Sequence, residues 1–145
     1  MAVGLESLHR SGIVYRAVCA DTLVITEQGL VQLVEPRHSK AIMGRTYTLC
    51  GQPTYMAPEM VEMRGHTQAV DWWALGVLVF EMLTGTTPFE AGAEDELHLY
   101  YAILDSEVAF PATVSATAQS AIGDFMRRDP AQASRRFGRG KGRAG

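Results

Sequence analysis

Hydrophobic and polar positions follow patterns that change from one segment of the chain to the next. At the start, apolar residues recur at helical spacing, which predicts a helix already under way at Met1 and ending near Gly12. Its apolar face would consist of Leu5, Leu8 and Ile13. A helix of this kind packs that face against a core and leaves its other face in water.

Two short apolar runs follow, one over residues 22–26 and one over residues 30–34. The residues between them are polar and end in Gly29, which suits a turn position that needs a positive φ. This arrangement predicts a small β-hairpin. From residue 35 to residue 58 no period is sustained, which predicts a long ordered loop, and loops of this length inside compact domains tend to be functional.

The remaining pattern predicts helices. A short helix is expected near Pro58, and a buried helix over residues 70–83, closed by Gly85, because nearly every position there is apolar. Two further helices are predicted over residues 94–104 and 115–128. The order helix, hairpin, long loop and then helices predicts a mainly α fold with a small β-hairpin.

Composition narrows the possible classes of protein. The chain has 145 residues and a formal net charge of −3, with 47% hydrophobic and 20% charged residues, as is typical of one modest globular domain. This charge favours neither nucleic acid nor a membrane as partner. The longest apolar run, residues 72–82, is interrupted by Glu81 and is too short to span a bilayer. Because there are two cysteines and no visible secretory signal, we expect a cytoplasmic protein without disulfides.

One short polar loop lies between two apolar runs at residues 13–25, in a position that often carries chemistry. Its side chains include Arg16, Ala17, Cys19 and Asp21, and none of them is an obvious general base. The four histidines of the chain are scattered without helical spacing, so we expect no metal site. Composition alone leaves open whether this loop is an active site or only the surroundings of one.

Two longer stretches carry a specific combination of motifs. GRTYTLCGQPTYMAPEM covers residues 44–60, and AVDWWALGVLVFEMLTGTTPF follows at residues 69–89. In these motifs the chain resembles the C-terminal lobe of eukaryotic protein kinases, most closely the cyclic-nucleotide-dependent branch of the AGC serine/threonine group. The resemblance extends from about Leu5 to Gly138.

This resemblance implies a protein-kinase-like C-lobe that lacks the N-lobe, a truncated form of the α+β kinase fold. It places a partial kinase domain at residues 1–138 and a basic, glycine-rich tail at residues 139–145. In the family, the N-lobe carries the glycine-rich phosphate loop. The GxGxxG at residues 140–145 has no predicted strand before it and no helix after it, so it is not a nucleotide-binding signal.

The resemblance also implies where catalytic groups should stand, and this chain has other residues there. Ala17 replaces the aspartate that accepts the proton of the substrate hydroxyl, and Cys19 replaces the lysine that steadies the γ-phosphate. Thr22 replaces a metal-binding asparagine. Glu35 replaces the aspartate that holds magnesium, and Arg37 places a cation where the metal should approach. ATP and Mg²⁺ are the cofactors of the family, but with these replacements we expect no cofactor and no intact catalytic residue.

A regulatory site of the family corresponds to three further residues. Thr48 matches the activation-loop threonine that is phosphorylated, and Arg16 and Lys40 match basic residues that clamp its phosphate. Two cations would form charge-assisted hydrogen bonds with a phosphothreonine and order the loop. The alternative is an exposed hydroxyl beside ordinary surface cations.

A peptide groove is implied as well. Asp21 and Glu81 match positions where related kinases recognise a basic residue upstream of the phospho-acceptor, and Leu49 matches a pocket for an apolar residue just after it. The competing interpretation is plain surface charge.

Three residues match scaffold positions of the family. Glu59 and Arg136 match a buried ion pair that anchors the end of the activation segment. Asp71 matches the residue that hydrogen-bonds the catalytic-loop backbone, and an acid near a helix N-terminus is favourable in itself.

Three hypotheses of function follow. The first is a catalytically inactive pseudokinase or fragment that acts by binding a protein, such as a kinase, a regulatory subunit or a substrate. The second is a divergent or truncated serine/threonine kinase that, when complete, transfers phosphate from ATP to proteins. The third is a degenerating gene product without activity. Ala17 and the Glu35-Pro36-Arg37 triplet favour the first over the second, because a missing N-lobe does not explain them.

Overall fold

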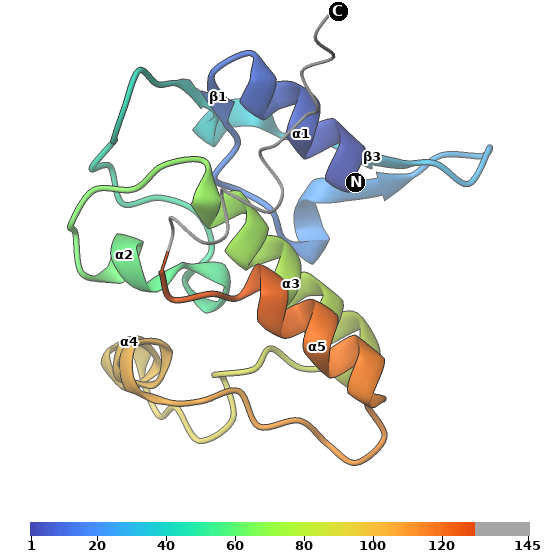
Figure 1. The fold of residues 1–145 in the computed structure, drawn as a ribbon, viewed down its shortest axis with the longest axis vertical. Coiled ribbons are helices and arrows are strands. Elements are labelled where there is room, and N and C mark those ends of the chain that lie inside the picture. The colour runs from blue at the N-terminus through green and yellow to red at the C-terminus, as the bar shows by residue number, and fades with distance from the viewer. Residues whose placement is uncertain (130–145) are drawn as a thin grey trace, which may run out of the picture.

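The computed structural model describes residues 1–129, which form a helical body with two small sheets near helix α1 (Figure 1). Helix α1 (Ala2–Arg10) buries Leu5 completely, as its apolar spacing predicts. Ile13, however, begins strand β1 (Ile13–Val14) and is not part of the helix. The predicted helical face was wrong at this position because Gly12, at φ 74°, turns the chain out of the helix.

Both sheets are antiparallel pairs, β2 with β3 and β1 with β4. The strands other than β1 are β2 (Leu23–Ile25), β3 (Val31–Leu33) and β4 (Lys40–Ala41). The first pair is the predicted hairpin, with Leu23 opposite Leu33 and Gly29 at φ 75°, and it is confirmed. The pairing of β1 with β4 was not predicted, because strands of two residues show no alternation that a sequence pattern could reveal.

The segment from residue 35 to residue 58 contains several single turns. The 3₁₀ turns of the chain are η1 (Ala20–Thr22), η2 (Pro36–His38) and η3 (Pro53–Tyr55), and the short helix α2 (Pro58–Val61) begins at the predicted proline. Prolines begin η2, η3 and α2, where the fixed φ is suitable and the missing N–H has no partner to lose. The predicted loop is therefore ordered, with strand β4 inside it.

Helix α3 (Ala69–Thr84) forms the centre of the core, and every side chain from Ala69 to Leu78 is buried. This burial explains why apolar residues occur on all sides of the helix. Gly85 ends the helix at φ 84°, a left-handed conformation that favours glycine. The predicted buried helix is confirmed.

Helix α5 (Ala116–Phe125) lies along α3 (Figure 1). The approach is close because Gly76 has no side chain: a Cβ atom there would lie 2.5 Å from Cγ of Met126. The rings of Trp72 and Phe125 stack across the two helices with centroids 6.2 Å apart. The prediction extended this helix to Arg128, but it ends at Phe125.

Helix α4 (Glu96–Asp105) packs against α2 and η3. Its N-terminus is capped by Asp95, whose carboxylate accepts a hydrogen bond of 2.8 Å from the backbone N–H of His98. Within residues 1–129, no helix has both the length and the apolar character that a bilayer span requires.

Candidate functional site

The loop of residues 15–22, called loop 15–22 below, is fixed to helix α3 by one buried carboxylate. Asp71 is fully buried, and its two oxygens accept hydrogen bonds from the backbone N–H groups of Tyr15 (2.8 Å) and Arg16 (2.7 Å). Nε2 of His9, on α1, lies 2.7 Å from Oδ2 of the same carboxylate. We call this group of contacts the Asp71 anchor. It joins α1, loop 15–22 and α3, at the position that the resemblance implied for Asp71.

Thr22 closes loop 15–22 on itself. Its hydroxyl donates to the carbonyl of Ala17 over 2.6 Å and accepts from the N–H of Cys19 over 3.2 Å. Ala17 and Cys19 are both buried, and neither cysteine of the chain forms a disulfide. The loop thus has a defined shape that depends on a short hydroxyl side chain at residue 22.

Glu35 and Arg37 pair with each other beside this loop. Nε of Arg37 donates to Oε2 of Glu35 over 2.6 Å, and Glu35 has a left-handed backbone at φ 67° where η2 begins. Both side chains line an open hollow of about 410 Å³, together with Ala17, Cys19 and Thr22 of the loop. The four positions that the resemblance marks as catalytic therefore do come together, around one hollow.

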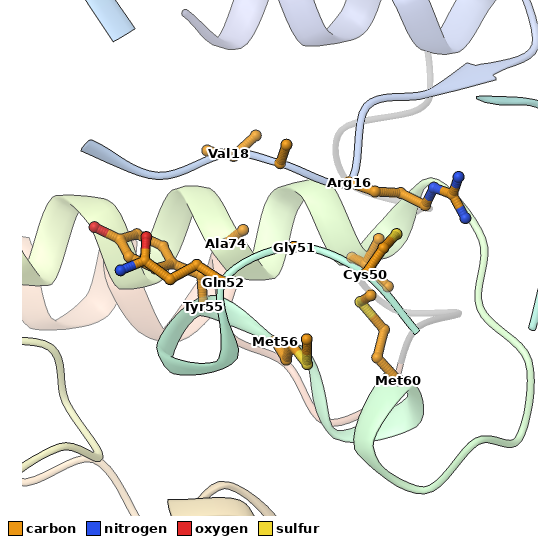
Figure 2. Close-up of a pocket in the computed structure, with 11 residues that line it drawn as sticks. Arg16, Val18, Cys50, Gly51, Gln52, Tyr55, Met56, Met60 and Ala74 are labelled. Atoms are coloured by element: carbon orange, nitrogen blue, oxygen red, sulfur yellow. The ribbon is translucent and has the colours of Figure 1, made fainter. Parts of the chain in front are cut away.

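The segment of residues 44–60, called segment 44–60 below, packs against loop 15–22 at Gly51. Gly51 has φ 96°, and a Cβ atom on it would lie 2.6 Å from the carbonyl oxygen of Arg16, so only glycine fits there. Figure 2 shows the cavity of about 20 Å³ between these two segments, lined by Arg16, Cys50, Met56 and Met60 among others. Burial raises the pKa of the Cys50 thiol, which keeps it protonated and weakly nucleophilic.

Three segments supply the residues that the resemblance matches to a phosphothreonine site: segment 44–60 (Thr48), loop 15–22 (Arg16) and strand β4 (Lys40). Thr48 is exposed, while Arg16 donates through Nε to the carbonyl of His38 over 2.8 Å. Nη1 of Arg16 is buried and has no hydrogen-bond partner among the described residues. Nζ of Lys40 donates to the hydroxyl of Thr46 over 3.1 Å, two residues before Thr48.

The predicted peptide-groove residues differ in exposure and in whether their side chains already have a hydrogen-bond partner. Asp21 is exposed at the hollow, and Leu49 is half-exposed in segment 44–60. Glu81 accepts a hydrogen bond from the hydroxyl of Tyr55, and this hydroxyl also accepts from the N–H of Ala20 over 3.3 Å. Burial, and then the bond to Glu81, raise the pKa of Tyr55. The role of Tyr55 could not be predicted from the sequence, because it depends on a contact between distant segments.

Of the scaffold pair, Glu59 is buried and Arg136 lies outside the described residues, as do the predicted domain end at residue 138 and the tail at 139–145. Burial raises the pKa of Glu59, which lines a cavity of about 140 Å³ with Arg45 and His66. Among residues 1–129, His, Cys, Asp and Glu form no cluster of three that could hold a metal ion.

Comparison with known proteins gives a consistent result. Residues 1–136 match the family model of the protein kinase domain. The chain is 40% identical over 129 residues to a "cAMP-dependent protein kinase catalytic subunit" of Dictyostelium discoideum, covering 89% of this chain and 20% of that protein. It is 40% identical over 134 residues to human "Ribosomal protein S6 kinase alpha-3", covering 90% and 18%.

A "cAMP-dependent protein kinase, catalytic subunit-like" protein of Caenorhabditis elegans is 36% identical over 128 residues, covering 88% of this chain and 32% of that protein. The chain thus spans about a fifth to a third of the length of these curated relatives. Because the family model covers nearly the whole sequence and these relatives are AGC-group kinases, the chain belongs to the protein kinase domain family.

Proposed function

We propose that this protein is a non-catalytic member of the protein kinase family that acts by binding another protein. The observation that carries this proposal is the composition of loop 15–22, which is held in a defined shape but has Ala17 at the position of the proton acceptor. A methyl group neither accepts a proton nor orients a substrate hydroxyl. Cys19, at the position of the lysine, is buried and carries no positive charge.

The residues at the family's metal position are a poor match for Mg²⁺. Magnesium needs several oxygen ligands in near-octahedral geometry. Glu35 is the one carboxylate at these positions, and an oxygen of it is already paired with the guanidinium of Arg37. The hydroxyl proton of Thr22 goes to the carbonyl of Ala17, and a nearby guanidinium repels a divalent cation. We therefore propose that the chain uses neither Mg²⁺ nor ATP.

A protein partner fits the surface that remains around loop 15–22. Asp21 and Glu81 give this region negative charge, and the half-exposed Leu49 adds an apolar position. An extended peptide with a basic residue before, and an apolar residue after, a central position would complement all three. The partner would be a substrate, regulatory subunit or kinase that presents such a segment.

The first experiment tests this proposal against a divergent kinase that is active in the present chain. Thermal unfolding is measured with ATP, with and without Mg²⁺, and transfer of label from ATP to serine peptides is assayed for the wild type and for Glu35→Gln. We expect no nucleotide-dependent stabilisation and no transfer. If the wild type transferred the label and Glu35→Gln did not, the chain would be an active kinase and the non-catalytic proposal would be overturned.

The second experiment tests binding directly. A fluorescent peptide with arginines upstream of an alanine and an apolar residue after it is titrated with the wild type, Asp21→Asn and Glu81→Gln. Each removed charge should weaken binding about threefold, and salt should weaken it further. Glu94→Gln, which removes an exposed carboxylate before α4, is the matched control and should bind like the wild type. Equal affinities for all four proteins would exclude this surface.

A further inference from the structure

His66 lies opposite Thr46 in an isolated antiparallel pair. The backbone N–H of Thr46 donates to the carbonyl of His66 over 2.9 Å, and the reverse bond measures 2.8 Å. Residues directly opposite each other in such a pair carry their side chains on the same face, with Cβ atoms about 5 Å apart. The side chains of His66 and Thr46 therefore leave the backbone on the same face, where Lys40 contacts the Thr46 hydroxyl.

Two buried nitrogen atoms in this region lack a hydrogen-bond partner among the described residues. One is Nε2 of His66, whose side chain is only 3% exposed, and the other is Nη1 of Arg16. A buried polar atom without a partner costs stability, so its presence in a folded protein needs an explanation. An oxyanion within reach of both nitrogen atoms would accept a hydrogen bond from each, with Nε2 of His66 protonated.

The charges around His66 also favour an anion. The positive charges of Arg16 in loop 15–22 and Lys40 in β4 disfavour a proton on the imidazole, whereas the negative charge of Asp71 in α3 favours it. Burial, and then these two cations, lower the pKa of His66 to about 4. The cavity that His66 lines adds Arg45, Glu59, Arg64 and Arg128. The sum is positive, and among residues 1–129 no carboxylate forms an ion pair with Arg16.

We propose that His66 is the third side chain, beside Arg16 and Lys40, that binds a phosphate carried on Thr48. This inference rests on the proposed non-catalytic function and adds one premise, that another kinase phosphorylates Thr48. Thr48 is exposed and lies two residues beyond Thr46, so a phosphate on it reaches the face that Thr46 shares with His66 and Lys40.

The role of His66 makes phosphate binding depend on pH. A phosphate dianion offsets the charges of Arg16 and Lys40, so the pKa of His66 should rise by about 1 to 3 on phosphorylation. The protonated imidazole then donates a charge-assisted hydrogen bond. Stabilisation by phosphorylation should therefore increase as pH falls through the raised pKa of His66, until the phosphate itself takes up a proton near pH 6.

The test uses the full chain with phosphothreonine installed at residue 48, compared with the unmodified chain between pH 5.5 and 8. The difference in Tm is measured for the wild type, His66→Asn, His66→Gln and the control His98→Asn, an exposed histidine on α4. The proton on Cε1 of His66 is followed by NMR in the wild type, which needs no variant to fold. Because phosphate ionisation is common to all forms, the comparison with the His66 variants isolates the imidazole.

We expect phosphorylation to raise Tm in every protein, with a gain about 3 °C larger at pH 6 than at pH 8 in the wild type and His98→Asn only. We also expect the NMR titration of His66 to shift upward. Equal pH profiles in all proteins, with an unmoved His66 resonance, would overturn the inference while the Arg16–Lys40 site stands. No gain on phosphorylation in any protein would overturn both. Neither outcome bears on the ATP experiment, which tests the non-catalytic function separately.

Discussion

Loop 15–22 differs sharply between its two sides. Toward α3, its backbone N–H groups donate to the fully buried carboxylate of Asp71. Toward the open hollow lie Ala17, Cys19 and Thr22, which the resemblance matches to a proton acceptor, a lysine and a metal ligand. The contacts with Asp71 involve only the backbone of the loop, so they do not depend on which side chains face the hollow. Under the proposed non-catalytic function, a member of the protein kinase family keeps the shape of this loop without reactive groups on it.

The largest expected effect is on the buried side. Asp71→Ala removes two backbone hydrogen bonds and leaves the buried N–H of Tyr15 and the partly buried N–H of Arg16 without an acceptor. The loss of these hydrogen bonds and of the contact with His9 should lower the free energy of unfolding by about 3–5 kcal/mol. Chemical denaturation measures this loss, and Asp71→Asn, which keeps one acceptor oxygen, should fall between Ala and the wild type. A cost of less than about 1 kcal/mol for Asp71→Ala would remove the distinction between the two sides.

The next effect is a loss of stability in acid caused by His66. Its pKa is lowered to about 4 in the folded protein, against about 6.5 in an unfolded chain. Between these two pKa values the unfolded state binds more protons than the folded state. The contribution of His66 to the free energy of unfolding is therefore fully present above about pH 6.5 and is lost as pH decreases toward 4. The loss should reach about 3 kcal/mol. Denaturation at several pH values measures it, and His66→Gln should show a flatter profile over this window; identical profiles would contradict the assignment.

The spacing of apolar residues and glycines along the chain predicted the elements whose contacts are close in sequence. The apolar run and Gly85 identified α3, and Gly29 identified the hairpin of β2 and β3. The pair of β1 and β4 escaped prediction because it joins two-residue strands that are distant in sequence.

The candidate site shows the same division. The resemblance placed Asp71 and the four catalytic positions, because motifs fix their place in the chain. It did not indicate that Tyr55 bonds Glu81 or that His66 lies opposite Thr46, since these contacts join separate segments. The pairing of Glu35 with Arg37 depends on the left-handed backbone of Glu35, which residue order does not reveal.

A smaller effect is expected at Thr22, which lines the hollow but also holds the loop. Thr22→Ala removes the hydrogen bonds to the carbonyl of Ala17 and the N–H of Cys19, and should cost about 1–2 kcal/mol. Thr22→Ser keeps the hydroxyl and should stay within about 0.5 kcal/mol of the wild type. Equal losses for Ala and Ser, measured by denaturation, would show that the methyl group and not the hydroxyl matters.

The smallest effect is expected for the ion pair at the family's metal position. The side chains of Arg37 and Glu35 are 69% and 49% exposed, so water screens their attraction and their coupling should not exceed about 1 kcal/mol. A double-mutant cycle with Glu35→Gln and Arg37→Gln measures this coupling by denaturation, and each single variant should unfold almost like the wild type. Glu35 lines the hollow together with residues of the loop that Asp71 holds, so the two carboxylates can be compared directly. If Glu35→Gln cost as much as Asp71→Ala, the residues around the hollow would be a structural support, and the separation of shape from chemistry would not hold.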